Sequence, residues 1–467
     1  MTSESQKTDS ILFQHNVTER GLMSVGGKGS YLYIEDPITG ERKTVIDGST
    51  GAAIGSLGHG DEDIAAEFAA AGKECAYSFH VYVSNYYAEK LAEFIINRSP
   101  EGAFSSALFV CSGSEANEHI MRISRQYFLE KGEPKRIKFI SRNQSYHGFT
   151  AGALALTGQK KFDDYKAIAM PSTQILKTSV ANPYRGMKEG ETEKEYKNRL
   201  LAELEQTFLE ADPSTVAGVF IETVSGSSLA CQTPLPGYLE GAREIIHKHG
   251  ALFISDEVMS GLGRCGTYHA WEQYLPKDKG PDLQSIGKTL GSGFVTIAGV
   301  LVSPKVKKVI AEGSKFTMGA QSFHGHVFNC RIALAVQKKI KEKKLVENSR
   351  EVGDYLGKLL QDRLGDHKYV GCIKGAGLFR GIEFVQDKST KQTFPHKINF
   401  GARFGDLCLK NGLTVMGGSG VADGYQGDQA LLCPAYITTK ELADSIVDIL
   451  ERSLNEITAE VDTDLET

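Results

Sequence analysis

Short apolar runs alternate with stretches of helical periodicity through the middle of the chain. Runs of this length, bounded by Gly, Ser or Pro, are typical of buried strands. The runs that predict strands lie at residues 107–111, 137–141, 218–222, 251–255, 283–286 and 298–303. Because strands alternate with helices, the pattern predicts an α/β fold in which a mostly parallel sheet is covered by helices.

Apolar spacing predicts the main helices. From Glu115 onward, Ala116 and Ile120 fall on one helical face, and residues 238–249 form a second helix that ends at Gly250. A long amphipathic helix is expected from Ile332, and residues 439–454 predict a terminal helix. The densely charged stretch 187–205 predicts an exposed loop and a helix start with a solvated face.

These elements predict two domains. Residues 73–335 contain all the predicted strands of the parallel sheet and form the large domain. Residues 336–467, with strands punctuated by Gly and Pro, form a smaller α+β domain that the N-terminal segment 1–72 joins.

Composition excludes several classes of protein. The chain has 467 residues, of which 41% are hydrophobic and 24% charged, and its formal net charge is −5 at pH 7. A charge of this sign gives no electrostatic footprint for nucleic acid or an anionic membrane. The eight cysteines show no CxxC pairing, which argues against a zinc site or a disulfide framework. No apolar run has transmembrane length, and residues 1–9 lack a signal-peptide core, so we expect a cytoplasmic protein.

The turn after the first predicted strand is a candidate phosphate site. Ser112-Gly113-Ser114 joins the strand at 107–111 to a helix. Free backbone N–H groups and the positive end of the helix dipole meet at such a junction, and Gly113 lets a phosphate approach the backbone. An ordinary Ser N-cap explains the turn equally well.

Carboxylates stand at the ends of two other predicted strands. Asp256 follows the strand at 251–255, and Glu222 ends the strand at 218–222. A buried ionised carboxylate requires a cationic partner, and a protonated pyridine nitrogen is one. A strand-end Asp that caps the next turn is the alternative.

Lys288 follows the strand at 283–286, with Gly287 before it and glycines at 291 and 293 after it. The lack of bulk lets a planar ring approach, and a partly desolvated lysine becomes a nucleophile able to form a Schiff base. Tyr146 precedes His147 and Gly148 on a loop, where its ring is free to cover a flat cofactor. Alone, Lys288 would be a solvated surface charge and Tyr146 a packing residue.

Taken together, these segments resemble the class III (ω-type) aminotransferases, pyridoxal-phosphate enzymes of fold type I. The resemblance runs almost from end to end. Its central motifs are Ser112-Gly-Ser-Glu-Ala116, Tyr146-His-Gly148, Ser255-Asp-Glu-Val258 and Gly287-Lys288. Further matches lie at 29–33, 46–53, 57–60, 261–264, 281–282, 375–378, 381–383, 427–428 and 431–434.

The resemblance implies a seven-stranded sheet in the large domain, bound pyridoxal 5′-phosphate and a role for each candidate residue. Lys288 would form the internal aldimine and Asp256 would pair with the pyridine nitrogen. Phosphate would be bound by Gly113 and Ser114. Three further residues would contact the ring or adjust its charge balance: Tyr146 on one face, Val258 on the other, and Glu222 beside it.

The chain also departs from the family pattern. The resemblance implies a homodimer whose subunits share their active sites. In the family, a Thr from the partner subunit usually binds the phosphate, and Val327 stands at that position here. Many relatives hold a substrate carboxylate with a C-terminal arginine, but no arginine lies between Arg403 and Arg452. The carboxylate would therefore be held elsewhere, with Arg264 and Arg380 as candidates, or the substrate is a bulky or uncharged amine or carbonyl compound.

The predicted function is transamination, in which an amino group moves from an amine or amino-acid donor to a ketone, aldehyde or keto-acid acceptor. An aminomutase, epimerase or decarboxylase on the same scaffold would share every motif. A nucleotide-binding dehydrogenase is disfavoured because the turn after Cys111 lacks GxGxxG. A silent binding protein would not need Lys288, Asp256 and the phosphate turn together.

Overall fold

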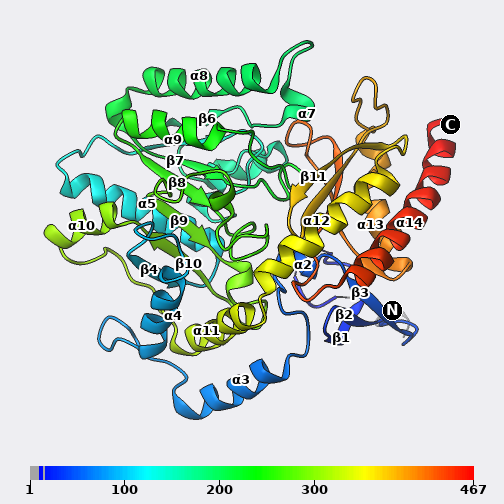
Figure 1. Cartoon of the computed structure of the whole chain (residues 1–467), viewed down its shortest axis with the longest axis horizontal. Helices are drawn as coiled ribbons and strands as arrows, with labels where there is room; N and C mark the ends of the chain where they lie inside the picture. Colours follow the sequence, from blue (N-terminus) through cyan, green and yellow to red (C-terminus); the bar gives the residue numbers. More distant parts are fainter. Residues whose placement is uncertain (1–9, 14–15, 467) are drawn as a thin grey trace.

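The computed structural model describes residues 10–13 and 16–466. Its centre is a seven-stranded sheet of order β4-β10-β9-β8-β7-β5-β6 (Figure 1). The strands are β4 (Ser106–Val110), β5 (Lys138–Arg142), β6 (Ile175–Thr178), β7 (Val216–Glu222), β8 (Leu252–Asp256), β9 (Leu283–Ile286) and β10 (Ala298–Val302). Only β10 runs antiparallel to its neighbours in this sheet. The prediction of an α/β fold with a mostly parallel sheet is confirmed.

All six predicted strands are present, and β6 was missed. Its sequence, Ile-Leu-Lys-Thr, contains Lys177 and does not read as an apolar run. The strand lies at the edge of the sheet, where only β5 pairs with it. A half-covered edge strand tolerates such a polar residue, so apolar content alone does not reveal it.

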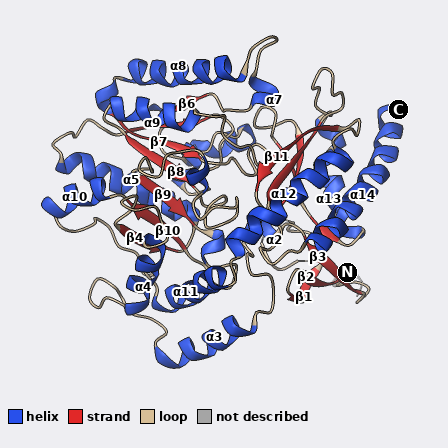
Figure 2. Cartoon of the chain, in the orientation of Figure 1, coloured by secondary structure: helices blue, strands red, loops and turns tan. Residues whose placement is uncertain are grey.

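Both faces of the sheet are buried, because neighbouring residues of a strand point to opposite faces. On β7, Val219 and Ile221 enter one apolar core, and Phe220 enters the other. Figure 2 shows the helices that form the covering layers. Those of this domain are α4 (Tyr86–Ile96), α5 (Gly113–Glu130), α6 (Ala151–Leu156), α7 (Pro183–Gly186), α8 (Glu193–Ala211), α9 (Tyr238–Lys248), α10 (Pro304–Glu312) and α11 (Val327–Glu342).

The prediction of a solvated face for the charged stretch 187–205 is only partly correct. Its helix, α8, does begin there and is capped by Thr192, which accepts a hydrogen bond from the backbone N–H of Glu195. However, Tyr196, Leu200 and Phe208 are buried in the core on one side of the sheet. The dense charges between them hid a regular apolar face.

A smaller α+β unit is built from both ends of the chain. Strand β3 pairs in parallel with β13, so that Leu413 lies opposite Ile46, and both residues belong to one core. The strands are β1 (Met23–Lys28), β2 (Tyr31–Glu35), β3 (Arg42–Asp47), β11 (Val370–Ala376), β12 (Phe379–Phe384), β13 (Leu413–Thr414), β14 (Met416–Ser419) and β15 (Asp428–Leu432). The helices are α2 (Thr50–Ala53), α3 (Glu62–Glu74), α12 (Leu345–Leu364), α13 (Phe400–Lys410) and α14 (Lys440–Glu466). The boundaries at 72 and 335 fall within α3 and α11, both of which contribute to this core, and the division stays a prediction.

Two helix bounds differ from those predicted. Helix α11 begins at Val327, before the expected Ile332, and α14 continues past 454 to Glu466. Both extensions carry polar residues within the helical register, which periodicity does not separate from a loop. Among the described helices, none is both long enough and apolar enough to cross a membrane.

Candidate functional site

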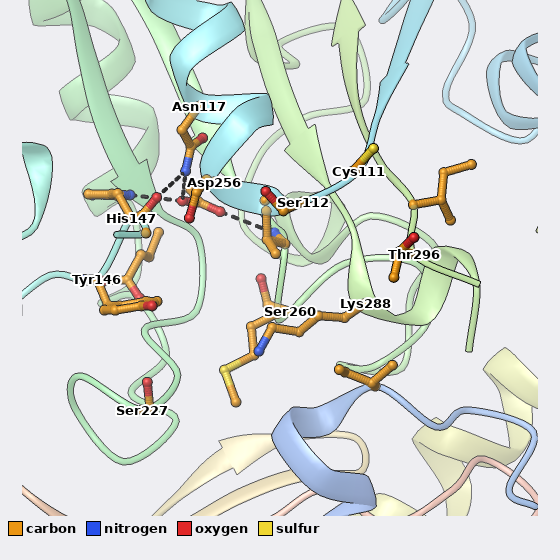
Figure 3. A pocket seen from close by; sticks show the side chains of 18 of the residues that line it. Cys111, Ser112, Asn117, Tyr146, His147, Ser227, Asp256, Ser260, Lys288 and Thr296 are labelled. Carbon is orange, nitrogen blue, oxygen red and sulfur yellow. Dashed lines mark hydrogen bonds and ion pairs between the residues drawn. The ribbon is translucent and has the colours of Figure 1, made fainter. Parts of the chain in front are cut away.

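A cavity of about 460 Å³ lies beyond the carboxyl ends of β7, β8 and β9, facing the first turn of α5. Open α/β sheets place ligands at this edge because the loops after parallel strands diverge there. Figure 3 shows Asp256, Lys288 and Tyr146 around the cavity. Its lining comprises Ile54, Cys111, Ser112, Gly113, Ser114, Asn117, Tyr146, His147, Gly148, Glu222, Val224, Ser227, Asp256, Val258, Met259, Ser260, Lys288, Gly293, Phe294, Val295, Thr296 and Ile297.

Asp256 ends β8 and is held by three donors. Its Oδ2 accepts hydrogen bonds from Asn117 Nδ2 and from His147 Nδ1, each 2.8 Å long, and its Oδ1 accepts one from the N–H of Val258 at 3.1 Å. Asn117 Nδ2 also donates to the carbonyl oxygen of His147, at 2.7 Å. The carboxylate is therefore fixed in position while it lines the cavity (Figure 3).

Asp256 keeps a negative charge although it is buried. Burial by itself would raise the pKa of this carboxyl, but the hydrogen bond and charge of His147 and the bonds from Val258 and Asn117 bring the pKa below its ordinary value. A fixed anion in a cavity is suited to binding a cationic ligand atom.

The first turn of α5 is capped and still offers free donors. Ser112 is the N-cap: its Oγ accepts from the N–H of Glu115 at 3.2 Å, and Glu115 Oε2 accepts from the N–H of Ser112 at 3.0 Å. The N-cap interpretation is therefore confirmed, and the phosphate site stays a prediction, which the cap permits because it leaves the N–H groups of Gly113 and Ser114 without helical partners. Ser114 Oγ accepts from the N–H of Phe149 at 3.1 Å, which leaves its hydroxyl proton available to an anion.

Lys288 projects into the same cavity from the turn after β9. Its backbone φ is +45°, a conformation that costs a non-glycine residue energy and that often marks a functional site. Its Nζ donates a 2.7 Å hydrogen bond to the carbonyl oxygen of Ala52, on α2. Burial lowers the pKa of the amine to about 8, so that a minor fraction is already uncharged near neutral pH.

Glu222 is a second buried carboxyl in the lining. It accepts hydrogen bonds from the N–H of Tyr146 at 3.2 Å and from Ser228 Oγ at 3.1 Å. Burial raises its pKa, and this outweighs the opposing effect of His147 and Arg142 nearby. The two carboxyls therefore differ, since the surroundings of Asp256 favour its charge more strongly.

Tyr146 and Val258 also line the cavity. Tyr146 is 38% exposed in the single chain, and burial raises the pKa of its phenol, so the ring is neutral. A Cβ atom at Gly113 would lie 2.7 Å from Cγ1 of Val258. Glycine at position 113 thus lets Val258 pack closely under the first turn of α5.

These residues fit pyridoxal phosphate. The phosphate is matched by the free N–H groups of α5 and by the hydroxyl of Ser114. The ring nitrogen is matched by the anionic Asp256, and the aldehyde by the partly uncharged amine of Lys288. Each group of the cofactor has a complementary partner in the cavity.

Three sequence candidates lie outside this lining. Arg264 is fully buried and donates to the carbonyl oxygens of Leu378 and Ala53, so it holds segments together and does not face a substrate. Arg380 donates to backbone carbonyls at 2.9 Å and to Asp354. The prediction that Arg264 or Arg380 binds a substrate carboxylate is therefore wrong.

Val327 is the first residue of α11, and its side chain is buried in its own chain. It does not line the cavity of that chain. The contact of Val327 with the phosphate of a partner subunit stays a prediction, although little of this side chain is exposed for such a contact.

Sequence reasoning missed the roles of Asn117 and His147. One signal was available for Asn117: it follows Gly113 by one helical turn, beside the apolar Ala116 and Ile120, where an amide needs a polar partner. For His147 the only signal was its place in Tyr146-His-Gly148. Neither signal identifies Asp256 as the shared partner.

Comparison with known sequences gives one consistent family. The aminotransferase class-III family matches residues 14–454. The chain is 37% identical to an uncharacterised aminotransferase of Schizosaccharomyces pombe, over 98% of both chains. It is also 32% identical to the chloroplastic gamma aminobutyrate transaminase 3 of Solanum lycopersicum, over 93% of this chain and 80% of the relative.

Solved structures that are similar to this chain are also transaminases. A transaminase obtained by ancestral reconstruction has a TM-score of 0.87 and 28% identity, covering 94% of this chain and 93% of its own. The omega transaminase of Pseudomonas jessenii in complex with PMP has a TM-score of 0.85 and 28% identity, covering 95% and 94%.

The lowered pKa of Lys288 predicts how the apoprotein captures pyridoxal phosphate. Below a pH of about 8 the amine is an ammonium ion and cannot attack an aldehyde, so the capture rate should rise through that pH. Rapid-mixing absorbance over a pH series measures the rate. Borohydride reduction and peptide mapping should then find the phosphopyridoxyl group on Lys288, and Lys288→Arg is the negative control. A midpoint near the ordinary 10.5, or label on another lysine, would contradict the assignment.

Proposed function

Since the chain belongs to the class-III aminotransferase family and is thus a pyridoxal-phosphate-dependent aminotransferase, we propose that Lys288, Asp256 and the first turn of α5 perform its transamination. The observation that carries the proposal is their convergence on one cavity from three separate segments. The cofactor supplies an electron sink for the charge that develops at the substrate carbon.

Asp256 acts on the ring nitrogen. Its negative charge favours the protonated nitrogen, and the donors from Asn117, His147 and Val258 prevent the carboxylate from turning away. Because these bonds exist before substrate arrives, the electrostatic stabilisation requires no reorganisation during the reaction.

Lys288 holds the cofactor through Nζ and moves the proton. With its Nζ released, Lys288 would accept a proton from the substrate carbon that carries the amino group and later return it. The carbonyl oxygen of Ala52 gives the released amine a hydrogen-bond acceptor inside the cavity. A pKa of about 8 suits an amine that must accept and donate a proton near neutral pH.

The remaining contacts set the position and charge of the ring. We propose that the N–H groups of Gly113 and Ser114 bind phosphate, that Tyr146 covers one ring face, and that Val258 supports the other. Glu222, held by Ser228, adjusts the charge beside the ring. No observation favours an aminomutase, epimerase or decarboxylase, and release of the amino group from the donor distinguishes these activities.

We propose that the substrates include amines without a carboxylate near the reacting carbon. Among the described residues, Lys288 is the only Lys or Arg in the lining, and it is committed to the chemistry. Ile54, Met259 and Phe294 contribute apolar surface instead. An unpaired carboxylate in this cavity would lose its hydration without compensation, whereas an apolar substituent would not.

Removal of the Asp256 charge tests its role. Asp256→Asn keeps the shape but loses the anion, and we expect the single-turnover rate of amino transfer to fall by about 10³-fold. Asp282→Asn is the matched control, because Asp282 is also a buried carboxyl with a histidine partner, His247, but lies outside the cavity. Equal rate losses in the two folded holoenzymes would show that the effect is structural.

Donor preference tests the substrate class. A primary amine should react in the first half-reaction about tenfold faster or more, in kcat/KM, than an amino acid of equal size with its carboxylate on the reacting carbon. Absorbance changes of the bound cofactor measure both. A clear preference for the amino acid would overturn this substrate proposal and leave transamination intact.

We propose that the active unit is a homodimer. An exposed apolar patch supports this: Val81, Tyr82, Val83, Phe316, Met318 and Phe323. Tyr82 is 84% and Phe316 75% exposed, and Tyr77 joins the two segments by donating to the carbonyl oxygen of Ser322 at 2.8 Å. Exposed apolar side chains gathered on neighbouring segments mark interaction sites.

Ser322 is exposed beside this patch, and we propose that its hydroxyl contacts the phosphate bound by a second copy. We expect Ser322→Ala to weaken cofactor binding about tenfold and Ser322→Thr to preserve it, because a charge-assisted hydrogen bond to phosphate is lost only in the first. Val327→Ala is the control. Sedimentation should give the mass of two chains. An active monomer, or a loss of affinity only in the Val327 variant, would contradict this arrangement.

A cytoplasmic location remains our proposal. All eight cysteines are free. Thiols that remain reduced are typical of a reducing compartment.

A further inference from the structure

A basic groove of about 290 Å³ lies between α4 and α11, and it shares no residue with the catalytic cavity. We call it the α4–α11 groove. It is lined by Lys90, Glu93, Phe94, Asn97, Arg98, Leu334, Lys338 and Lys341. Four side chains are cationic and one is anionic, so the groove has a strong positive potential.

None of the four cations forms a salt bridge within the described part of the chain. In this respect, Lys338 and Lys341 differ from two other cations of α11. Arg331 binds Glu67 and Glu74, and Lys339 binds Asp61 and Asp63, all on or next to α3. The face of α11 toward α3 is thus neutralised by acidic partners. The face toward α4 carries Lys338 and Lys341 without them.

Aromatic rings lie against three of these cations, and the Nζ of Lys90 is 4.2 Å from the Tyr86 ring centroid. The Phe94 ring centroid lies 6.0 Å from Arg98 Cζ and 5.7 Å from Lys341 Nζ, and Arg98 Cζ lies 4.4 Å from the Tyr268 ring centroid. Cation–π contacts fix the charged groups without using their N–H donors. The donors stay available to a ligand.

Arg98 provides the second indication. Its Nη1 is shielded from solvent and has no hydrogen-bond partner. A buried donor without an acceptor is costly, and such cases usually mark a missing ion or water. The helix dipoles are another explanation for clustered cations, because the C-terminal ends of α4 and α11 favour positive charges such as Arg98 and Lys341. The dipoles do not explain the unpaired Nη1 of Arg98, and they do not reach Lys90.

We propose that the α4–α11 groove is a second ligand site of this chain, which binds the phosphate group of a small phosphorylated molecule. Because Nη1 of Arg98 is shielded, the phosphate would be bound by the remaining N–H groups of this guanidinium, and the lysines add point charges. Such a ligand would also relieve the mutual repulsion of four like charges. Asn97 offers a neutral donor for the remainder of the molecule.

Pyrophosphate binding to the holoenzyme tests the proposal, because the bound cofactor already fills the phosphate site at α5. Calorimetry should find one pyrophosphate per chain. The double variant Lys338→Gln/Lys341→Gln should bind about tenfold more weakly or worse, and Arg98→Lys should also weaken binding. The control Lys135→Gln/Lys194→Gln removes two exposed lysines outside the groove and should bind like wild type. Transamination rates should be unchanged in the groove variants.

Four outcomes would overturn the proposal. Wild type could show no saturable binding, or the control could weaken binding as much as the groove variant, which would reveal only general charge attraction. Sedimentation of the groove variant could show a changed oligomeric state, which would make the groove an interface between copies. Binding lost in Ser114→Ala and kept in Lys338→Gln/Lys341→Gln would assign the pyrophosphate to the catalytic cavity.

Discussion

The cavity at the carboxyl edge of the sheet depends on keeping one ionised carboxylate, Asp256, at the buried end of an apolar strand. Transfer of a charge out of water is costly unless donors replace the lost hydration. Asn117, His147 and the N–H of Val258 supply those donors, from a helix, a loop and the next turn. Because the three donors must reach the two oxygens of one carboxylate, the packing of α5 and of the loop at 146–148 against β8 is strongly constrained.

The same packing places the other functional groups. Helix α5, which carries Asn117, also presents its first turn to the cavity, and Gly113 is needed there because Val258 lies so close. The loop that carries His147 brings Tyr146 to the cavity edge and gives Glu222 a backbone donor. A structural requirement of Asp256 thus brings the first turn of α5, the ring of Tyr146 and a second carboxyl to one cavity.

Charge is distributed differently in the cavity and on the surface of this chain. In the cavity, Lys288 is the single Lys or Arg among the described lining residues, and burial makes it a weaker base. The α4–α11 groove instead collects cations that α3 does not neutralise. A neutral amine suits proton transfer and covalent chemistry, whereas clustered, fully charged groups suit binding of an anion.

The sequence by itself determined the mostly parallel sheet and placed Lys288, Asp256 and Gly113 at strand ends and turns, because apolar runs, strand-end polar residues and glycines are local patterns. It missed β6 and the buried face of α8, where Lys177 and dense charges obscure the apolar register. Only the tertiary structure decided which groups meet across the chain. It assigned Asn117 and His147 to Asp256 and removed Arg264 and Arg380 from the cavity, because hydrogen-bond partners distant in sequence are fixed by packing and not by spacing along the chain.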